Sequence, residues 1–283
     1  CIPGILPELT HSEMIEISRI YSVAGLLGPD KGLIDKRPYR SPHHTISDVA
    51  LAGGGITPHP GEISLAHRGV LFLDELTEFH TKALEILRQP MENGEIIINR
   101  AASSVRFPAD FMLVAAINPC KCGYYPDPVR CSCTPLQVKR FIGRISQPIL
   151  DRIDINVEVK PVGAEILSPD APAEESSSSI RQRIEKARRI QAERYDAEGF
   201  LYNSQLNGKN IYKYCIASDT ARGLLDEIYR KYELSARSYH KLLKVARTIA
   251  DLDMSDIIHE RHVLEAPFYK STENNFSGVL KKP

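Results

Sequence analysis

Two unbroken apolar runs in the first half of the chain are each followed at once by polar side chains. Val70 to Leu73 is followed by Asp74 and Glu75, and residues 111–117 are followed by Asn118. Runs without alternating polar positions are typical of strands covered on both faces, as in the middle of a parallel sheet. Ligands bind at the carboxyl ends of such strands. The sequence therefore predicts an α/β sheet with a candidate site where these two strands end.

Other periodic patterns predict the elements around this sheet. Thr10 and Glu13 have the spacing of a capping box, which predicts a helix to about residue 24. Further expectations are helices over 78–89 and 136–145, a hairpin over 95–107 and a strand over 155–159. Residues 25–61 are rich in Gly, Pro, His and Arg, and are expected to form a long functional loop within an insert over 25–68.

The second half of the chain shows helical spacing throughout. Apolar residues recur from Ile180 onward, and further helices are predicted over 218–231, 235–251 and 258–266. The segment 161–179 is rich in Pro, Ala, Glu and Ser, which is typical of a linker. The expected organisation is an α/β core over 1–160, this linker, a helical domain over 180–270 and a flexible tail over 271–283.

Composition argues against a general attraction to nucleic acid or membrane. The chain has 36 Lys and Arg against 36 Asp and Glu, so binding to a polyanion requires a local basic patch. No apolar run has the length of a membrane span, and we expect no secretory leader. We therefore expect a cytoplasmic protein with no membrane partner.

Four of the six cysteines fall into two close pairs, which have the spacing of a metal site. Cys120 and Cys122 precede a short Tyr-Pro-Asp-Pro segment, and Cys131 and Cys133 follow it. Four such thiols can converge on one tetrahedral structural Zn²⁺. The C-x-C spacing is tighter than the common C-x₂-C, so unligated or redox-active thiols remain the alternative.

The insert carries several cationic and imidazole side chains. Arg37 and Arg40 suit contact with a polyanion or with a partner subunit, as do His43, His44, His59 and His67. A metal site on the paired histidines is disfavoured, because no Cys, Asp or Glu stands at a fixed spacing beside them.

Four motifs together resemble AAA+ ATPases of the magnesium-chelatase-like ComM/YifB family. They are Tyr39-Arg-Ser-Pro-His-His-Thr-Ile-Ser47, Gly61-Glu-Ile-Ser-Leu-Ala-His67, Asn118-Pro-Cys120 and Ile149-Leu-Asp-Arg-Ile-Asp154. The resemblance extends over roughly residues 1–268 and is specific in this combination. It implies an AAA+ α/β core followed by an all-helical lid domain.

The resemblance also implies roles for individual residues. Asp74 and Glu75 correspond to the Walker B pair, of which Asp74 holds Mg²⁺ and Glu75 polarises the attacking water. Asn118 corresponds to the sensor that orients this water. Arg152 corresponds to the finger that reaches a neighbouring subunit's ATP, and Arg237 to a second sensor in the lid that contacts the nucleotide. Taken alone, each of these residues also fits an ordinary position on a solvated surface or in a turn. The resemblance rests on the whole set in its order along the chain.

One family motif has no match in this chain. The phosphate-binding P-loop, G-x-x-x-x-G-K-[ST], occurs nowhere in the sequence, and the chain opens Cys-Ile-Pro-Gly without Met. The expectation is a fragment that starts just after the P-loop and lacks ATPase activity by itself.

The resemblance favours a ring-forming DNA motor, expected as a hexamer, that acts in branch migration, recombination or natural transformation. In that case Arg100 and Arg106 on the hairpin, with Arg37 and Arg40, contact the DNA backbone. The alternative is the ATPase subunit of a magnesium-chelatase-type complex that remodels a protein partner. The cysteine cluster favours the motor, because chelatase subunits lack it. A degenerate adaptor without turnover is disfavoured by the intact set of site residues.

Overall fold

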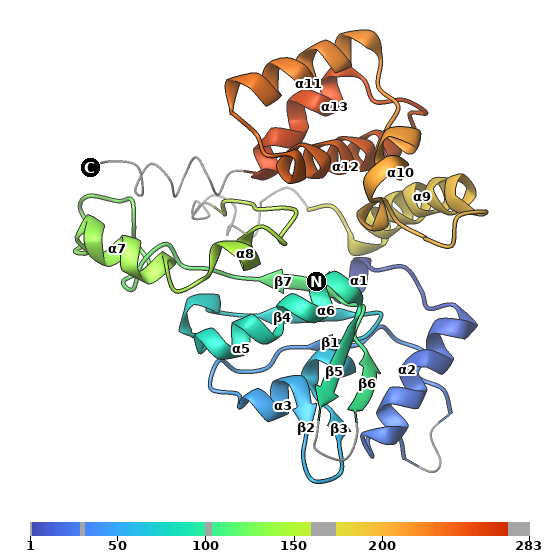
Figure 1. Ribbon diagram of the computed structural model, residues 1–283, viewed down its shortest axis with the longest axis vertical. Coiled ribbons are helices and arrows are strands. Elements are labelled where there is room, and N and C mark those ends of the chain that lie inside the picture. Colours follow the sequence, from blue (N-terminus) through green and yellow to red (C-terminus); the bar gives the residue numbers. More distant parts are fainter. Residues whose placement is uncertain (1, 29–31, 100–103, 160–173, 271–283) are drawn as a thin grey trace. The chain divides into compact units, whose positions relative to one another are not determined.

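The computed structural model describes residues 2–28, 32–99, 104–159 and 174–270 (Figure 1). These residues form two compact units. One unit is residues 8–153, and the other comprises residues 2–7 with the described residues from 154 to 270. Each unit has its own buried apolar core.

A parallel three-stranded sheet is the centre of the first unit (Figure 1). The strand order is β1 (Tyr39–Arg40), β4 (Val70–Leu73), β7 (Met112–Ala115). Tyr39 is paired with Val70, which is paired in turn with Met112. The predicted α/β sheet is confirmed, with the Val70 to Leu73 strand in its middle.

The middle strand is buried because the chain covers it on both faces. Val70, Leu71 and Leu73 are fully inaccessible to solvent. Burial of each such side chain contributes about 1.5–3 kcal/mol relative to exposure. The core around the strand includes Leu51, Ile63, Leu76, Leu84, Leu87 and Ile149.

Several short helices surround the sheet. The Thr10 capping box is present, and α2 extends over His11–Val23. The other helices of this unit are α3 (Asp48–Ala52), α4 (Glu62–Leu65), η1 (Leu76–Glu78), α5 (Thr81–Ile86), α6 (Arg88–Asn93), α7 (Pro135–Ile142) and α8 (Gln147–Leu150).

The single helix predicted over 78–89 is wrong, because the chain forms two helices there. Pro90 has no N–H to donate to the Ile86 carbonyl, so α5 ends at Ile86. Pro90 fits instead into the first turn of α6, where a missing donor costs little.

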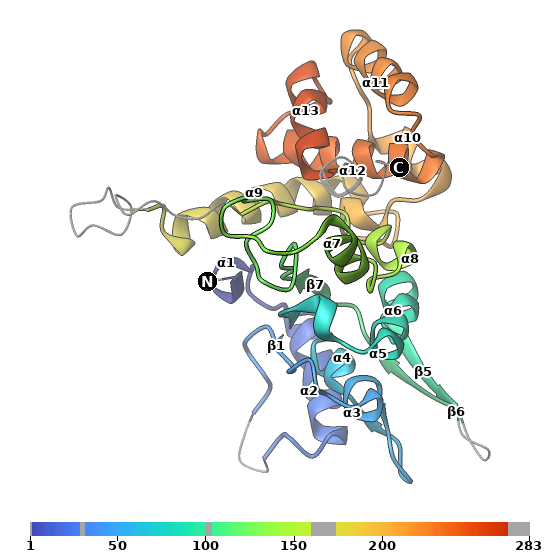
Figure 2. The ribbon, with the colours of Figure 1, turned by 90° about the vertical axis from the view of Figure 1, so that its left-hand side faces the viewer.

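Two antiparallel hairpins complete the unit. The predicted hairpin is confirmed as β5 (Glu95–Asn99) paired with β6 (Ser104–Pro108). A second hairpin, β2 (Gly53–Gly54) with β3 (His59–Pro60), lies in the stretch expected to be loop, as do β1 and α3. Figures 1 and 2 show both hairpins extending to the same side of the unit, away from β7.

The second unit is helical. The predicted helices are found as α9 (Ser177–Tyr195), α11 (Asp219–Lys231), α12 (Ala236–Leu252) and α13 (Glu260–Glu265). The unit also contains α1 (Ile2–Ile5), η3 (Asn203–Gln205), α10 (Gly208–Tyr214) and η4 (Ala266–Lys270). Within the described ranges, no helix combines the length and apolarity that crossing a bilayer requires.

The predicted strand over 155–159 is wrong. Residues 154–159 have no strand assignment, and Ile155, Val157 and Val159 are all exposed. The backbone N–H of Asn156 donates to the Tyr269 carbonyl rather than to a neighbouring strand. Most of the predicted linker and the predicted tail lie outside the described residues.

Candidate functional site

The acidic pair and Asn118 lie at the same edge of the sheet. Leu73 at the end of β4 is paired with Ala115 at the end of β7. Beyond this pair, the Ala116 N–H donates to the Leu73 carbonyl at 2.9 Å, and the Leu76 N–H donates to the Ala116 carbonyl at 3.0 Å. The turn 74–75 therefore lies beside the segment that leads to Asn118. All three polar side chains belong to exposed residues.

Glu75 has a backbone conformation that is rare for a non-glycine residue. Its φ of 51° and ψ of 49° lie in the left-handed region. Two short-range hydrogen bonds hold the turn: the Glu75 N–H donates to Asp74 Oδ1 at 2.9 Å, and the Glu78 N–H donates to the Glu75 carbonyl at 2.7 Å. Such strain costs about 1–3 kcal/mol and persists only where surrounding structure fixes it.

His44 contacts Glu75, which the sequence patterns did not predict. Its Nδ1 lies 3.4 Å from Glu75 Oε2. His44 follows β1, the neighbour of β4 in the sheet, so two sheet neighbours bring the pair together. This contact was hard to predict from the sequence, because β1 has only two residues and lies within a Gly- and Pro-rich stretch.

Arg152 is held within its own chain. Its guanidinium forms an ion pair with Glu92 and donates to the carbonyl of Pro148, four residues earlier in the chain. Only 9% of its side chain is exposed. Nε is buried and has no hydrogen-bond partner within the described part of the chain. A role toward a neighbouring subunit therefore requires the Glu92 pair to open.

Arg237 belongs to the helical unit. It is the second residue of α12, close to the N-cap Ser235, and it is exposed. Its expected contact with nucleotide stays a prediction.

Two arginines expected to contact DNA make internal ion pairs. Arg37 is 10% exposed and donates through both terminal nitrogens to the Glu13 carboxylate at 3.1 Å. Arg40 donates to both oxygens of Glu62 at 2.6 Å. The pair with Glu62 uses two of the five N–H donors of Arg40, so contact of these arginines with DNA stays a prediction.

The hairpin arginines differ from this pair. Arg106 on β6 is 69% exposed and makes a loose contact of 3.3 Å with Glu95. Arg100 lies outside the described residues.

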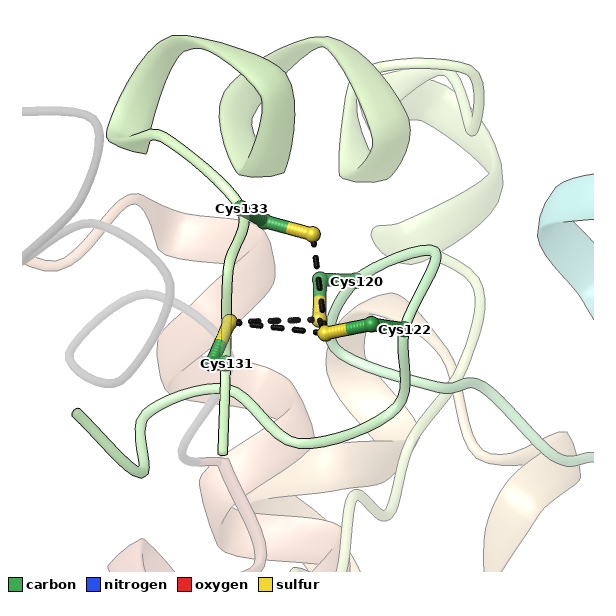
Figure 3. Close-up of side chains that lie close together, drawn as sticks. All are labelled: Cys120, Cys122, Cys131 and Cys133. Carbon is green, nitrogen blue, oxygen red and sulfur yellow. Dashed lines mark hydrogen bonds between the residues drawn. The ribbon is translucent and has the colours of Figure 1, made fainter. Parts of the chain in front are cut away.

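The four cysteines converge on one point, with their sulfur atoms turned toward one another (Figure 3). The four Sγ atoms all lie within 4.8 Å of each other. Cys122 Sγ lies 3.3 Å from that of Cys120, 3.5 Å from that of Cys131 and 3.6 Å from that of Cys133. Zn–S bonds of about 2.3 Å in a tetrahedron separate the sulfur atoms by about 3.8 Å. The spacing of the thiols is close to that of a Cys₄ zinc centre.

One thiol of the group is set up to ionise. The Tyr124 backbone N–H and then the Cys120 thiol, as hydrogen-bond donors to Cys122 Sγ, lower the pKa of Cys122 to about 6. The convergence of the four sulfur atoms, rather than the pKa of this one thiol, is compatible with a metal ligand set.

Comparison with known proteins identifies the family. Residues 1–167 match the family model of magnesium chelatase, subunit ChlI, and residues 174–270 match the model of its C-terminal part. The chain belongs to this family. With the parallel sheet and the helical unit in place, the AAA+ fold class expected from the resemblance is confirmed.

Individual relatives of this ChlI-family chain agree with the resemblance. It is 43% identical over 272 residues to competence protein ComM of Haemophilus influenzae, covering 95% of this chain and 52% of that protein. It is 41% identical over 273 residues to the uncharacterized protein YifB of Salmonella typhimurium, covering 96% and 53%. The magnesium-chelatase 38 kDa subunit of Acidiphilium rubrum is 28% identical over 225 residues, covering 76% and 55%. The chain spans about half the length of these curated relatives.

Proposed function

We propose that the protein containing this ChlI-family chain hydrolyses ATP with Mg²⁺. The observation that carries the proposal is the arrangement of Asp74, Glu75 and Asn118 at one edge of the parallel sheet, beyond the ends of two neighbouring strands. Exposed carboxylates at a strand end are the oxygen ligands that Mg²⁺ takes beside phosphate.

Each residue has a separate part in this proposal. Asp74 would hold Mg²⁺, which neutralises charge on the phosphate oxygens. Glu75 accepts a hydrogen bond from the attacking water, and the Asn118 amide orients it. Arg152 and Arg237 place permanent positive charge where negative charge develops.

The test of the ATPase is made in a protein that joins this chain to the remaining length of its relatives. Glu75→Gln keeps the shape of the side chain but loses its basicity, so turnover falls by about 10²- to 10⁴-fold. ATP binding remains, because Asp74 is untouched. Asp74→Asn instead weakens Mg²⁺-dependent binding. A Glu75→Gln protein that turns over ATP at the wild-type rate overturns the proposal.

We further propose that this ATPase is a ring-forming DNA motor. Its similarity to a competence protein supports this, as do the two hairpins that extend to one side of the sheet unit. Turnover measured with forked or four-way DNA is expected to rise, and the rise is expected to vanish in Glu75→Gln.

The second candidate is an ATPase that remodels a protein partner. The family model and the 28% identity to a magnesium-chelatase subunit favour it. Turnover that is indifferent to every DNA tested, and that rises on addition of a protein partner, supports this candidate against the motor.

We also propose that the cysteine cluster binds a structural zinc ion. Zinc per chain, measured by atomic emission after dialysis, is expected to be one for the wild type and near zero for Cys131→Ser/Cys133→Ser. Cys215→Ser is the matched control, because Cys215 is a buried thiol of the helical unit that does not belong to the cluster. Wild-type protein purified without stoichiometric metal overturns this proposal.

A further inference from the structure

The segment that follows β1 brings an imidazole to the proposed catalytic carboxylate. His44 Nδ1 lies 3.4 Å from Glu75 Oε2, with 28% of the His44 side chain and 50% of the Glu75 side chain exposed. The distance is that of an ion-pair contact across two neighbouring strand ends. Neither the ATPase chemistry nor the cysteine cluster accounts for the paired histidines of the insert.

The ring of His44 is held on two sides. The His43 ring lies against it with centroids 4.1 Å apart. The buried Phe79 ring meets it in an edge-to-face arrangement, with centroids 6.4 Å apart. His43 is fixed in turn, because its Nδ1 is 2.9 Å from Thr45 Oγ1. The Ile46 N–H donates to the His43 carbonyl at 2.9 Å, which closes the turn. The contact with Glu75 therefore comes from a packed ring.

Glu75 needs such a partner more than an ordinary surface acid does. Its backbone is in the left-handed region, and half of its side chain is exposed. Within the described residues, His44 is the cationic or imidazole side chain in ion-pair contact with its carboxylate. An exposed carboxylate without a fixed partner samples several rotamers, which lowers the fraction of time in a reactive geometry.

We propose that His44 is a positioning residue for Glu75. The inference rests on the proposed ATPase function. The Nδ1 side of the imidazole holds Oε2 of Glu75 and leaves Oε1 to accept a hydrogen bond from water. The segment 41–47 thereby sets the rate of hydrolysis, and it does so without contributing to ATP binding.

The experiment compares three substitutions at one position. His44→Phe keeps a ring between His43 and Phe79 but removes the ring nitrogen that contacts Glu75, so kcat is expected to fall by about 10- to 100-fold with KM for ATP unchanged. His44→Asn places an amide N–H near the position of Nδ1 and is expected to restore most of kcat. His44→Ala, which removes both the ring and its nitrogen, is expected to resemble His44→Phe.

His11→Phe is the matched control, because His11 is an exposed histidine at the first position of α2 and belongs neither to the acidic pair nor to a hairpin. It is expected to retain wild-type turnover. Melting temperatures of all variants establish that they are folded.

A readout without nucleotide comes from NMR of the histidine ring nitrogens. Substitution Glu75→Gln is expected to move the ring resonances of His44 and leave those of His11 in place.

The outcomes separate this proposal from the ATPase itself. Wild-type turnover in His44→Phe, while Glu75→Gln is inactive, overturns the positioning role and leaves the ATPase standing. A His44→Asn protein as slow as His44→Phe also overturns it, because the ring shape rather than the donor then matters. Absence of turnover in the wild type overturns the proposed function first.

Discussion

Asp251 is the buried acceptor around which the helical unit is organised. Its carboxylate is fully inaccessible and accepts from Arg194 at 2.5 and 3.1 Å and from Arg247 at 3.1 Å. The Asn203 amide donates to it at 2.8 Å, and Tyr195 donates to Asn203 at 2.6 Å. These contacts join α9, η3 and α12 through one charge.

We predict that Asp251→Asn strongly destabilises the helical unit. Two guanidinium groups then remain near each other without their counter-charge, and breaking a buried pair in this way costs about 3–5 kcal/mol. Chemical denaturation measures the loss. Arg222→Ala is the control, because Arg222 lies in an exposed pair with Asp219 at 3.6 Å and its loss leaves stability near wild type. Equal stability of the two variants contradicts the prediction.

His67 is a histidine whose burial favours the neutral ring. Only 4% of the residue is exposed. Its Nδ1 accepts the Asp110 backbone N–H at 3.1 Å, and Nε2 lies 3.2 Å from Glu16. Burial lowers the pKa of His67 below its ordinary value of 6.5, although the hydrogen bond to Glu16 opposes the shift.

This environment predicts a pH-dependent stability of the sheet unit. The unfolded chain protonates His67 near pH 6.5, whereas the folded chain does so only at lower pH. The His67 contribution is therefore present above pH 6.5 and is lost as the pH falls below it. Thermal unfolding followed between about pH 7.5 and 5.5 is expected to show this loss. In His67→Asn the slope over that interval is smaller; an unchanged slope contradicts the assignment.

At the scale of single elements, the β5–β6 hairpin is the clearest candidate for contact with DNA. Arg106 is opposite Ile97 in the ladder, and its side chain is largely exposed. Its contact with Glu95 is long and solvated, so little free energy opposes an exchange of this carboxylate for a phosphate.

We predict that Arg106→Ala weakens DNA binding without regard to sequence. The slope of log affinity against log salt falls by about 1, because one phosphate contact is lost. Fluorescence anisotropy over a salt series measures it. Lys82→Ala is the control, since Lys82 is an 83% exposed cation on α5 rather than on a hairpin strand. Identical salt slopes for Arg106→Ala and the wild type exclude the hairpin strand from the DNA interface.

For the whole molecule, the proposed ring places Arg152 of one subunit at the site of the next. Its side chain is instead paired with Glu92 in the described chain, so assembly has to redirect it. A ring also makes the catalytic residues of one site come from two chains.

This arrangement predicts complementation between inactive subunits. Arg152→Ala and Glu75→Gln are each expected to abolish turnover alone. A mixture of the two is expected to regain part of it, because Glu75→Gln subunits supply Arg152 to sites that retain Glu75. Size-exclusion chromatography with ATP verifies that both variants assemble. A mixture with no recovery, from variants that do assemble, indicates that Arg152 acts within its own chain.

Local sequence determined the parts of the protein whose partners are near in the chain. The capping box of α2, the β5–β6 hairpin and the convergence of Cys120 to Cys133 each depend on residues fewer than about fifteen positions apart. The unbroken apolar run at 70–73 predicted burial on both faces by itself, because no polar position interrupts it. The order of residues along the chain was therefore enough to predict the strand end before Asp74. The second run was predicted less well, because β7 ends at Ala115, three residues before Asn118, and is only partly buried.

Tertiary structure decided everything that required a distant partner. The two-residue strand β1 exists because Val70 and Leu71 offer it a ladder, and the same pairing carries His44 to Glu75. Arg37 contacts Glu13, 24 positions away, which a count of basic residues does not reveal. The apolar alternation at 155–159 remained without a strand, because strand formation needs a neighbour and not only a pattern. Strand pairing between segments that are distant in the chain depends on both segments. The sequence of one segment alone therefore does not predict it.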